Sequence, residues 1–270
     1  VSLSYMSSSA ALASAWRPPG QHGGSSIRPL RPTAMTTTTL PQRGVADAAP
    51  VRPPLTLLAS EPLRATLEAA QALGHWHRAP RDVGQGRTVV LFPGLGTDGL
   101  TLWPLRRHLE RAGYRALDWG QGLNTGPRGE VDAWLDDLAD AVQARTAPAR
   151  EFSLVGWSLG GFYARELAKR WPDRVQRVIT IGTPFSGGPD DTHVGWLFRL
   201  LNGRRPPDEA ALRERLAEPP PVPTVSLYSR RDGVVNWRAC LHTRRWPQAS
   251  DIEVQASHMG MGWAPQVLQR

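Results

Sequence analysis

Six short runs of aliphatic and β-branched residues, each followed by a segment with helical periodicity, constrain the fold of this 270-residue chain more than any other feature. Runs of this length suit buried strands, and the segments between them are long enough for crossover helices. The pattern predicts an α/β fold with a mostly parallel sheet and helices on both faces. The expected strands are residues 87–92, 114–119, 152–156, 175–181, 224–228 and 251–255.

Three segments before residue 150 carry helix signals. The first starts at Ser60, a good N-cap residue, and places Glu61 and Pro62 in its first turn. The third segment has five apolar residues at helical spacing, so we expect that face to cover the sheet. The three expected helices are residues 60–73, 102–111 and 131–145.

Composition divides the chain into a tail and one domain. Residues 1–54 are rich in Ser, Thr, Ala, Pro and Gly, and Asp47 is their single acidic residue. Such a segment buries too little apolar surface to offset its ordering entropy, so we expect a disordered extension. The hydrophobic content of 40% is enough for a core, and we assign residues 55–270 to one domain.

One connection breaks the strand and helix rhythm. Residues 184–223 exceed the length of an ordinary crossover and include "HVGWLFRLLNG", which is apolar almost all round as a helix. This insertion is either an extra packed helix or a lid that walls an apolar pocket. The candidate substrate-contacting residues are Trp157, Trp196, Leu197, Phe198 and Leu201.

Several classes of protein are disfavoured. A single cysteine, Cys240, excludes an internal disulfide and disfavours a cysteine-rich zinc site, and we expect no metal and no cofactor. The net charge of +8 comes from arginines spread along the chain, with Lys169 the only lysine, so we expect no nucleic-acid partner. No secretory signal or membrane span is evident, which predicts a cytoplasmic location.

The stretch "LVGWSLGG" has the form G-x-S-x-G at a junction between a strand and a helix. A serine at this junction lies in a sharp turn, where side chains at the flanking glycines would clash with neighbouring backbone. The turn exposes the hydroxyl above the carboxyl end of the sheet, and the helix N-terminus favours developing negative charge. Ser158 is therefore the candidate nucleophile.

A serine nucleophile needs a base and an acid that orients the base. In this architecture the acid and then the histidine should follow late strands. Asp232 follows the strand at 224–228 and His258 follows the strand at 251–255, so both positions are filled. Rival acids are Asp190 and Asp191, which follow the preceding strand. His193 and His242 are less well placed, because neither directly follows a core strand.

Acyl transfer also needs donors for the oxyanion. One candidate is the backbone N–H of Leu159, the residue after the nucleophile. The other is the N–H of Leu95, in the loop "LFPGLGTDG" after the first expected strand. That loop contains no G-x-x-x-x-G-K-[ST] pattern, so a phosphate-binding role is disfavoured.

With these segments in order, together with "ITIGTPFSG", the chain from about residue 55 to 270 resembles the α/β-hydrolase superfamily, specifically its bacterial lipase-like and esterase-like members. The resemblance implies Ser158 as nucleophile, His258 as base, Asp232 as its acid, and Leu95 and Leu159 as oxyanion donors. Pro93-Gly94 replaces the His-Gly of many members. No room for N-terminal antiparallel strands exists before residue 87, which implies a reduced sheet of about six strands.

These observations predict a serine hydrolase that opens carboxylic esters, with medium or long acyl chains favoured by the apolar insertion. An acyltransferase or thioesterase would use the same triad, and a non-catalytic binding module is a further alternative. The expected partner is a small ester or lipid, with peripheral contact to a lipid interface through the Arg-rich tail and the apolar helix. The oligomeric state is not predicted.

Overall fold

The computed structural model describes residues 52–75, 82–186 and 214–269. Most of the expected extension, residues 1–51, and the centre of the insertion, residues 187–213, lie outside the described residues. The domain boundaries therefore stay predictions. Within the described part of the chain, no helix combines the length and the hydropathy needed to cross a membrane.

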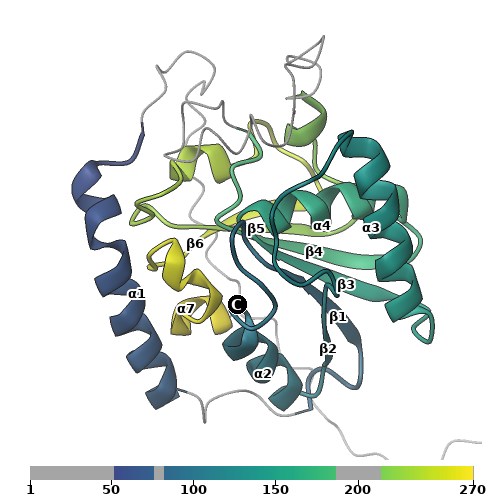
Figure 1. Ribbon diagram of the computed structural model, residues 1–270, viewed down its shortest axis with the longest axis horizontal. Coiled ribbons are helices and arrows are strands. Elements are labelled where there is room, and N and C mark those ends of the chain that lie inside the picture. The colour runs from purple at the N-terminus through teal and green to yellow at the C-terminus, as the bar shows by residue number, and fades with distance from the viewer. Residues whose placement is uncertain (1–51, 76–81, 187–213, 270) are drawn as a thin grey trace, which may run out of the picture. The chain divides into compact units, whose positions relative to one another are not determined.

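Six strands form one sheet in which every neighbouring pair is parallel, as the sequence predicted. Their order is β2-β1-β3-β4-β5-β6 (Figure 1). The strands are β1 (Thr88–Phe92), β2 (Arg115–Asp118), β3 (Phe152–Trp157), β4 (Val175–Ile181), β5 (Thr224–Tyr228) and β6 (Ala249–Glu253).

The strand order reverses once. The chain runs from β1 outward to β2, returns past β1 to β3, and then continues to β6. At such a reversal, the loops that leave the carboxyl ends of the two central strands diverge and leave a crevice between them. Phe92 of β1 pairs with Gly156 of β3. The loop after β1 therefore lies beside the turn that carries Ser158.

Helices flank both faces of the sheet (Figure 1). Alternate residues of β1 separate the two cores: Phe92 packs with residues of α3 and α4, whereas Leu91 packs with residues of α2 and the C-terminal segment. Helices that lie wholly within the described residues include α1 (Leu55–His75), α2 (Trp103–Arg111), α3 (Val131–Thr146), α4 (Leu159–Arg170) and α7 (Pro265–Leu268), with the 3₁₀ turns η4 (Trp237–Cys240) and η5 (Met259–Gly262).

The helix expected at 60–73 exists as α1, but its predicted start is wrong. It begins at Leu55, so Pro62 lies inside the helix rather than in its first turn. Ser60 is not the N-cap residue, and its hydroxyl instead donates to the Leu57 carbonyl at 2.9 Å. The amides of Leu57 and Leu58 donate to the carbonyl of Pro54, so the helix begins at Leu55, ahead of the start that Ser60 suggested.

The orientation of α1 is unusual for a surface helix. Leu63, Leu67 and Leu73 are exposed, while Glu61 is 1% exposed on the face that packs against the domain. A buried carboxylate is costly unless it is hydrogen-bonded, so this face has to meet donors. Those donors are backbone amides of the loops that follow β5 and β6.

The last strand is also displaced from its prediction. β6 covers Ala249–Glu253 rather than 251–255. Its pairing explains the difference, because Thr224, the first residue of β5, pairs with Ala249. Beyond β6 the backbone of Ala256 is held by the Ser229 hydroxyl, and the chain has left the ladder.

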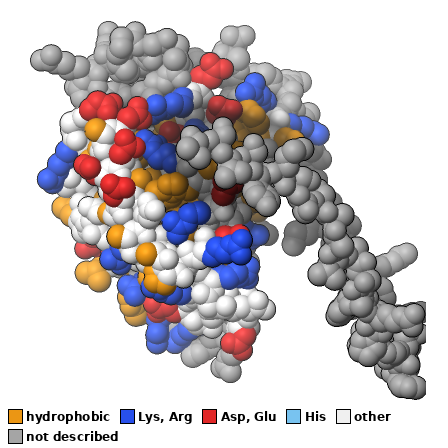
Figure 2. Space-filling view, turned by 90° about the vertical axis from the view of Figure 1, so that its right-hand side faces the viewer, with side chains coloured by type: hydrophobic (Ala, Val, Ile, Leu, Met, Phe, Trp, Pro, Cys, Tyr) orange, Lys and Arg blue, Asp and Glu red, His pale blue; other side chains and the backbone are white. Residues whose placement is uncertain are grey.

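Acidic and basic side chains lie close together on the face shown in Figure 2, with hydrophobic side chains exposed only in small groups between them. Ion pairs between acidic residues of α3 and arginines later in the chain join these segments. Asp136 pairs with Arg170 at 3.2 Å, and Asp132 pairs with Arg215 at 3.1 Å. Exposed pairs such as these contribute about 0–1 kcal/mol each, so they add little to the stability that comes from the two cores.

Candidate active site

Ser158 stands at the turn between β3 and α4 in a strained conformation. Its φ is +52°, a region that non-glycine residues rarely adopt and that costs about 1–3 kcal/mol. Two backbone contacts hold it there: its amide donates to the Ile181 carbonyl at 2.8 Å, and its carbonyl accepts from the Thr183 hydroxyl at 2.9 Å. The strain is therefore stabilised by the end of β4.

The glycines around Ser158 are required by close contacts, as the sequence predicted. A methyl group at Gly156 would lie 2.2 Å from the Gly160 carbonyl oxygen. One at Gly160 would lie 2.3 Å from the Phe92 carbonyl oxygen, and one at Gly161 would lie 2.0 Å from the Thr183 hydroxyl. Helix α4 thus begins in direct backbone contact with β1 and β3.

The three polar side chains predicted to act together meet at this edge of the sheet. His258 Nε2 lies 3.2 Å from Ser158 Oγ, and His258 Nδ1 lies 2.6 Å from Asp232 Oδ2. All three residues are buried, with exposures of 7% for Ser158, 3% for Asp232 and 6% for His258. The hydrogen bonds form an unbroken path from the hydroxyl to the carboxylate.

The Asp232 carboxylate is fixed by its own loop. Its second oxygen, Oδ1, accepts the amides of Val234 at 2.8 Å and Val235 at 2.7 Å. Oδ2 faces His258, so the orientation of the carboxylate toward the imidazole is fixed. Ser229 ties this loop to the histidine loop, because its hydroxyl donates to the Ala256 carbonyl at 2.7 Å and accepts the Arg231 amide at 3.0 Å.

Opposing effects set the pKa of His258. Burial by itself would lower this pKa, since it disfavours the imidazolium. The charge and hydrogen bond of Asp232, together with the charge of Glu61, outweigh burial and raise the pKa of His258 above its ordinary value of 6.5. The site is thus arranged to stabilise an imidazolium, which is the form that a base takes after it accepts a proton from serine.

Trp157, expected to contact substrate, packs against His258. Its indole N–H donates to the His258 carbonyl at 3.2 Å, and the two ring centroids are 6.0 Å apart. The indole also lies against Gly94, where an added methyl group would meet it at 3.3 Å. Its contact with substrate stays a prediction. Trp196, Leu197, Phe198 and Leu201 lie outside the described residues, as do Asp190, Asp191 and His193.

Leu159 directly follows Ser158, and the loop that carries Leu95 lies near it, so both stay expected oxyanion donors. Leu159 is the first residue of α4, so its N–H has no carbonyl one turn earlier within the helix. Leu95 follows Gly94, where an added methyl group would lie 3.4 Å from the Ser158 Cβ. The loop after β1 is therefore close enough to reach a group bound at the serine.

Sequence reasoning missed Asn124, which holds that loop from the segment after β2. Its side-chain amide donates to the Pro93 carbonyl at 2.8 Å, and its backbone carbonyl accepts the Gly96 amide at 2.8 Å. Its Oδ1 accepts the Tyr163 hydroxyl at 3.1 Å, and burial raises the pKa of that phenol well above its ordinary value. The stretch "GLNTGPRG" shows only a turn, so no local signal could have singled out Asn124.

Glu61 and Glu68 on α1 were also missed as parts of the site. Glu61 bonds to backbone amides of both loops, and Glu68 bonds to Ser257, the residue before His258. In contrast, His242 is occupied elsewhere: its Nδ1 lies 2.7 Å from Asp251, and its Nε2 lies 3.2 Å from Arg165.

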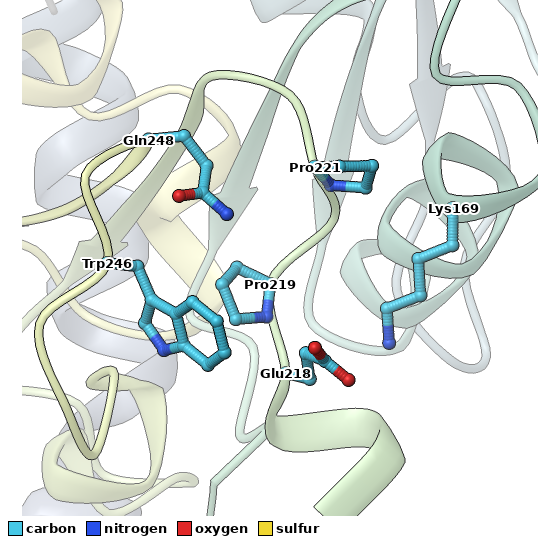
Figure 3. A pocket seen from close by; sticks show the side chains of 6 residues that line it. All are labelled: Lys169, Glu218, Pro219, Pro221, Trp246 and Gln248. Carbon is cyan, nitrogen blue, oxygen red and sulfur yellow. The ribbon is translucent and has the colours of Figure 1, made fainter.

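A pocket of about 290 Å³ lies away from these residues (Figure 3). It sits near the last turn of α4 and the residues that precede β5 and β6, whereas the loops with Ser158, Asp232 and His258 follow the carboxyl ends of strands. Lys169 points its ammonium at Glu166 Oε1, 2.7 Å away, so its charge is already paired. The side chains that line the pocket are Lys169, Glu218, Pro219, Pro221, Trp246 and Gln248.

Among the described residues, no group of three or more His, Cys, Asp or Glu side chains is placed to hold a metal ion. Cys240 is buried, and burial, with the nearby charges of Asp232 and Asp251, raises the pKa of its thiol well above the ordinary value. This thiol is therefore a poor nucleophile.

The sequence pattern of the Alpha/beta hydrolase family matches residues 89–266, which are more than half of the chain. This chain belongs to that family. Its six-stranded parallel sheet with flanking helices agrees with the family's fold. A monoacylglycerol lipase from Paleococcus ferrophilus superimposes with a TM-score of 0.50 at 18% identity, over 71% of this chain and 95% of the lipase. At that identity the likeness shows the fold alone.

Curated relatives include pimeloyl-(acyl-carrier protein) methyl ester esterases. The one from Shewanella sp. (strain MR-7) is 34% identical over 101 residues, which are 37% of this chain and 36% of the esterase. The one from Aeromonas hydrophila subsp. hydrophila is 27% identical over 172 residues, which are 63% of this chain and 66% of the esterase. The chain thus spans about a third of the length of the first relative and about two thirds of the second.

Proposed function

We propose that this protein is a serine hydrolase that cleaves carboxylic esters through an acyl-enzyme. The observation that carries the proposal is the hydrogen-bonded path from Ser158 Oγ through His258 to Asp232, with all three side chains buried. In this role Ser158 attacks the ester carbonyl carbon while His258 Nε2 takes the hydroxyl proton. Asp232 keeps the other imidazole proton on Nδ1, which leaves Nε2 free to accept.

The attack by Ser158 gives a tetrahedral intermediate and leaves the proton on His258. The tetrahedral intermediate collapses when the His258 imidazolium gives its proton to the leaving alkoxide, which departs as alcohol. Water then attacks the acyl carbonyl as His258 takes its proton, and the acid leaves as Ser158 regains its hydrogen. The N–H groups of Leu95 and Leu159 are the proposed donors to the oxyanion in both steps.

We propose methyl esters of acyl groups joined to a carrier protein as the first substrate class to test. Support comes from the named activity of relatives that align over 63% of this chain. Esters of free medium-chain or long-chain acids are the alternative suggested by the apolar sequence of the insertion. The cytoplasmic location and contact with a lipid interface stay predictions.

A fluorophosphonate probe tests the nucleophile, because it labels serines that a neighbouring base has activated. We expect labelling at Ser158 and loss of labelling in Ser158→Ala. With p-nitrophenyl esters, Ser158→Ala should lower kcat by about 10⁴-fold or more. Ser250→Ala changes an exposed serine of β6 and serves as the matched control. Full activity in Ser158→Ala would contradict the proposal.

A second assay separates the substrate classes. It compares hydrolysis of p-nitrophenyl esters of increasing acyl length with hydrolysis of methyl esters, free or attached to acyl carrier protein. Competing alcohols and thioesters in the same reactions reveal transfer or thioester cleavage. Preference for the carrier-bound methyl ester supports the proposed class, and preference for long free esters or for transfer overturns it.

A further inference from the structure

Glu61 reaches both loops that carry the base and its acid. Its Oε1 accepts the Gly233 amide at 2.8 Å, beside Asp232, and the His258 amide at 3.0 Å. Its Oε2 accepts the Met259 amide at 2.9 Å. One carboxylate, 1% exposed, thus joins backbone groups on either side of the hydrogen bond between His258 and Asp232.

The energetics favour a dedicated contact. A buried carboxylate is tolerated only with several hydrogen bonds or a paired cation, and this one has three backbone amides and Arg64 Nη2 at 2.8 Å. Bonds from amides to an ionised acceptor are about twice as strong as bonds between neutral groups. The two loops are therefore tied to α1 more firmly than apolar packing alone would achieve.

Close contact between α1 and the loops leaves little room for displacement. A methyl group at Gly233 would lie 2.5 Å from the Leu57 backbone, and one at Gly260 would lie 1.7 Å from Glu68 Oε2. The loop of Asp232 and the 3₁₀ turn after His258 thus touch the same helix face. A shift of α1 would move both loops.

We propose that Glu61 is a positioning residue for the reaction, because its carboxylate fixes the backbone of His258 relative to the Asp232 loop. This inference rests on the proposed ester hydrolysis. Glu61 contacts backbone amides of the two loops and Arg64, so in this proposal it acts through the loops and through its charge. Its loss should therefore reduce the chemical step more than substrate binding.

The ionisable groups around His258 define the expected pH effect. Asp232 faces the ring from the loop after β5, and Glu61 faces the backbone of His258 from α1 with Arg64 paired to it. Glu68 of α1 bonds to Ser257, and the Cys240 thiol near Asp232 has a pKa raised by burial. Because the negative charge of Glu61 favours the imidazolium, its removal should lower the pKa of His258.

The experiment compares Glu61→Gln with Glu68→Gln and the wild type. Glu68 provides the matched control, since it lies on the same helix face but reaches only the histidine loop, through the amide and hydroxyl of Ser257. Competent sites are counted with the fluorophosphonate probe, and kcat and KM are measured from pH 5 to 9 with a p-nitrophenyl ester. The pKa of His258 is measured separately by NMR titration of its ring proton.

In Glu61→Gln we expect kcat per competent site to fall by about 10- to 100-fold, since displacement by about 1 Å has effects of this size, with a smaller change in KM. The acid limb of the kcat/KM profile and the NMR titration of His258 should both shift to lower pH. Glu68→Gln should leave the NMR midpoint in place and reduce kcat less. A Glu61→Gln protein with wild-type kcat per competent site and an unshifted midpoint would overturn the inference.

Two further measurements keep the test decisive. If Glu61→Gln does not fold, Arg64→Met removes the cation paired with Glu61 but keeps the carboxylate, and the midpoint of His258 should move to higher pH. An unchanged midpoint in Arg64→Met would then overturn the inference. The NMR titration needs no substrate, so it still tests Glu61 if the wild type fails to hydrolyse esters and the proposed function is wrong.

Discussion

Replacing Gly160 with alanine tests whether the nucleophile turn depends on direct backbone contact. The added methyl group would lie 2.3 Å from the Phe92 carbonyl oxygen and 2.7 Å from that of Pro93. An ordinary contact distance is about 3.5 Å, so α4 and the end of β1 would have to separate by about 1 Å. Phe92 is fully buried and pairs with Gly156 of β3, so β1 cannot move aside alone.

The expected cost follows from this geometry. Overpacking of a core costs about 1–3 kcal/mol, and contact with two backbone oxygens places Gly160→Ala near the upper end. For a domain of this size, about 3 kcal/mol corresponds to a fall in Tm of roughly 6–12 °C. The Pro93 carbonyl begins the loop with Leu95, so a shift of about 1 Å there should also lower kcat by up to about 100-fold.

The assay pairs a thermal melt with hydrolysis of a p-nitrophenyl ester. Gly74→Ala is the control, since it makes the same change in α1 with no atom within 4 Å of the added methyl group. That control should be neutral or should stabilise by up to about 1 kcal/mol. If Gly160→Ala melts with the wild type and keeps its kcat, the proposed close packing of the turn on β1 is refuted.

Three further predictions concern the site. Because Asp232 raises the pKa of His258 against the effect of burial, kcat/KM of the wild type should rise with pH through a midpoint above 6.5. Asp232→Asn should lower that midpoint and reduce kcat by about 10⁴-fold, and a midpoint unchanged in this variant would contradict the assignment. Asn124→Ala releases the Pro93 carbonyl and should reduce kcat by about 10- to 100-fold with little change in KM, as measured by steady-state kinetics. Cys240 should resist a thiol reagent in the native protein and react in urea, and rapid native labelling would show that it is accessible.

The sheet and the triad positions could be predicted because their signals are local. Each strand has its own apolar run, and parallel strands bring their carboxyl ends to one edge, so the order of Ser158, Asp232 and His258 placed them together. Asn124 and Glu61 gave no such signal. Their partners are backbone amides and carbonyls, which every residue carries, and only the folded chain decides which of them meet.

The start of α1 is another feature that local sequence signals did not predict. Ser60 has the form of an N-cap and Pro62 the form of a first-turn residue, yet the helix begins at Leu55. Contact with the loops at Gly233 and Gly260 outweighs these preferences, because helix propensity is a small term beside tertiary packing. The exposed leucines of α1 follow from the same contact, since the inward face carries the two glutamates.

The attachment of α1 to the two loops also has a consequence for how the chain folds. The hydrogen bonds of Glu61 to His258 and Met259 join residues that are 197 and 198 positions apart. During synthesis α1 emerges long before these partners, and contacts of such large sequence separation form late and slowly. Until they form, the serine has no base held in place. On the proposed function, we therefore expect a nascent or partly folded chain to lack esterase activity until these contacts have formed.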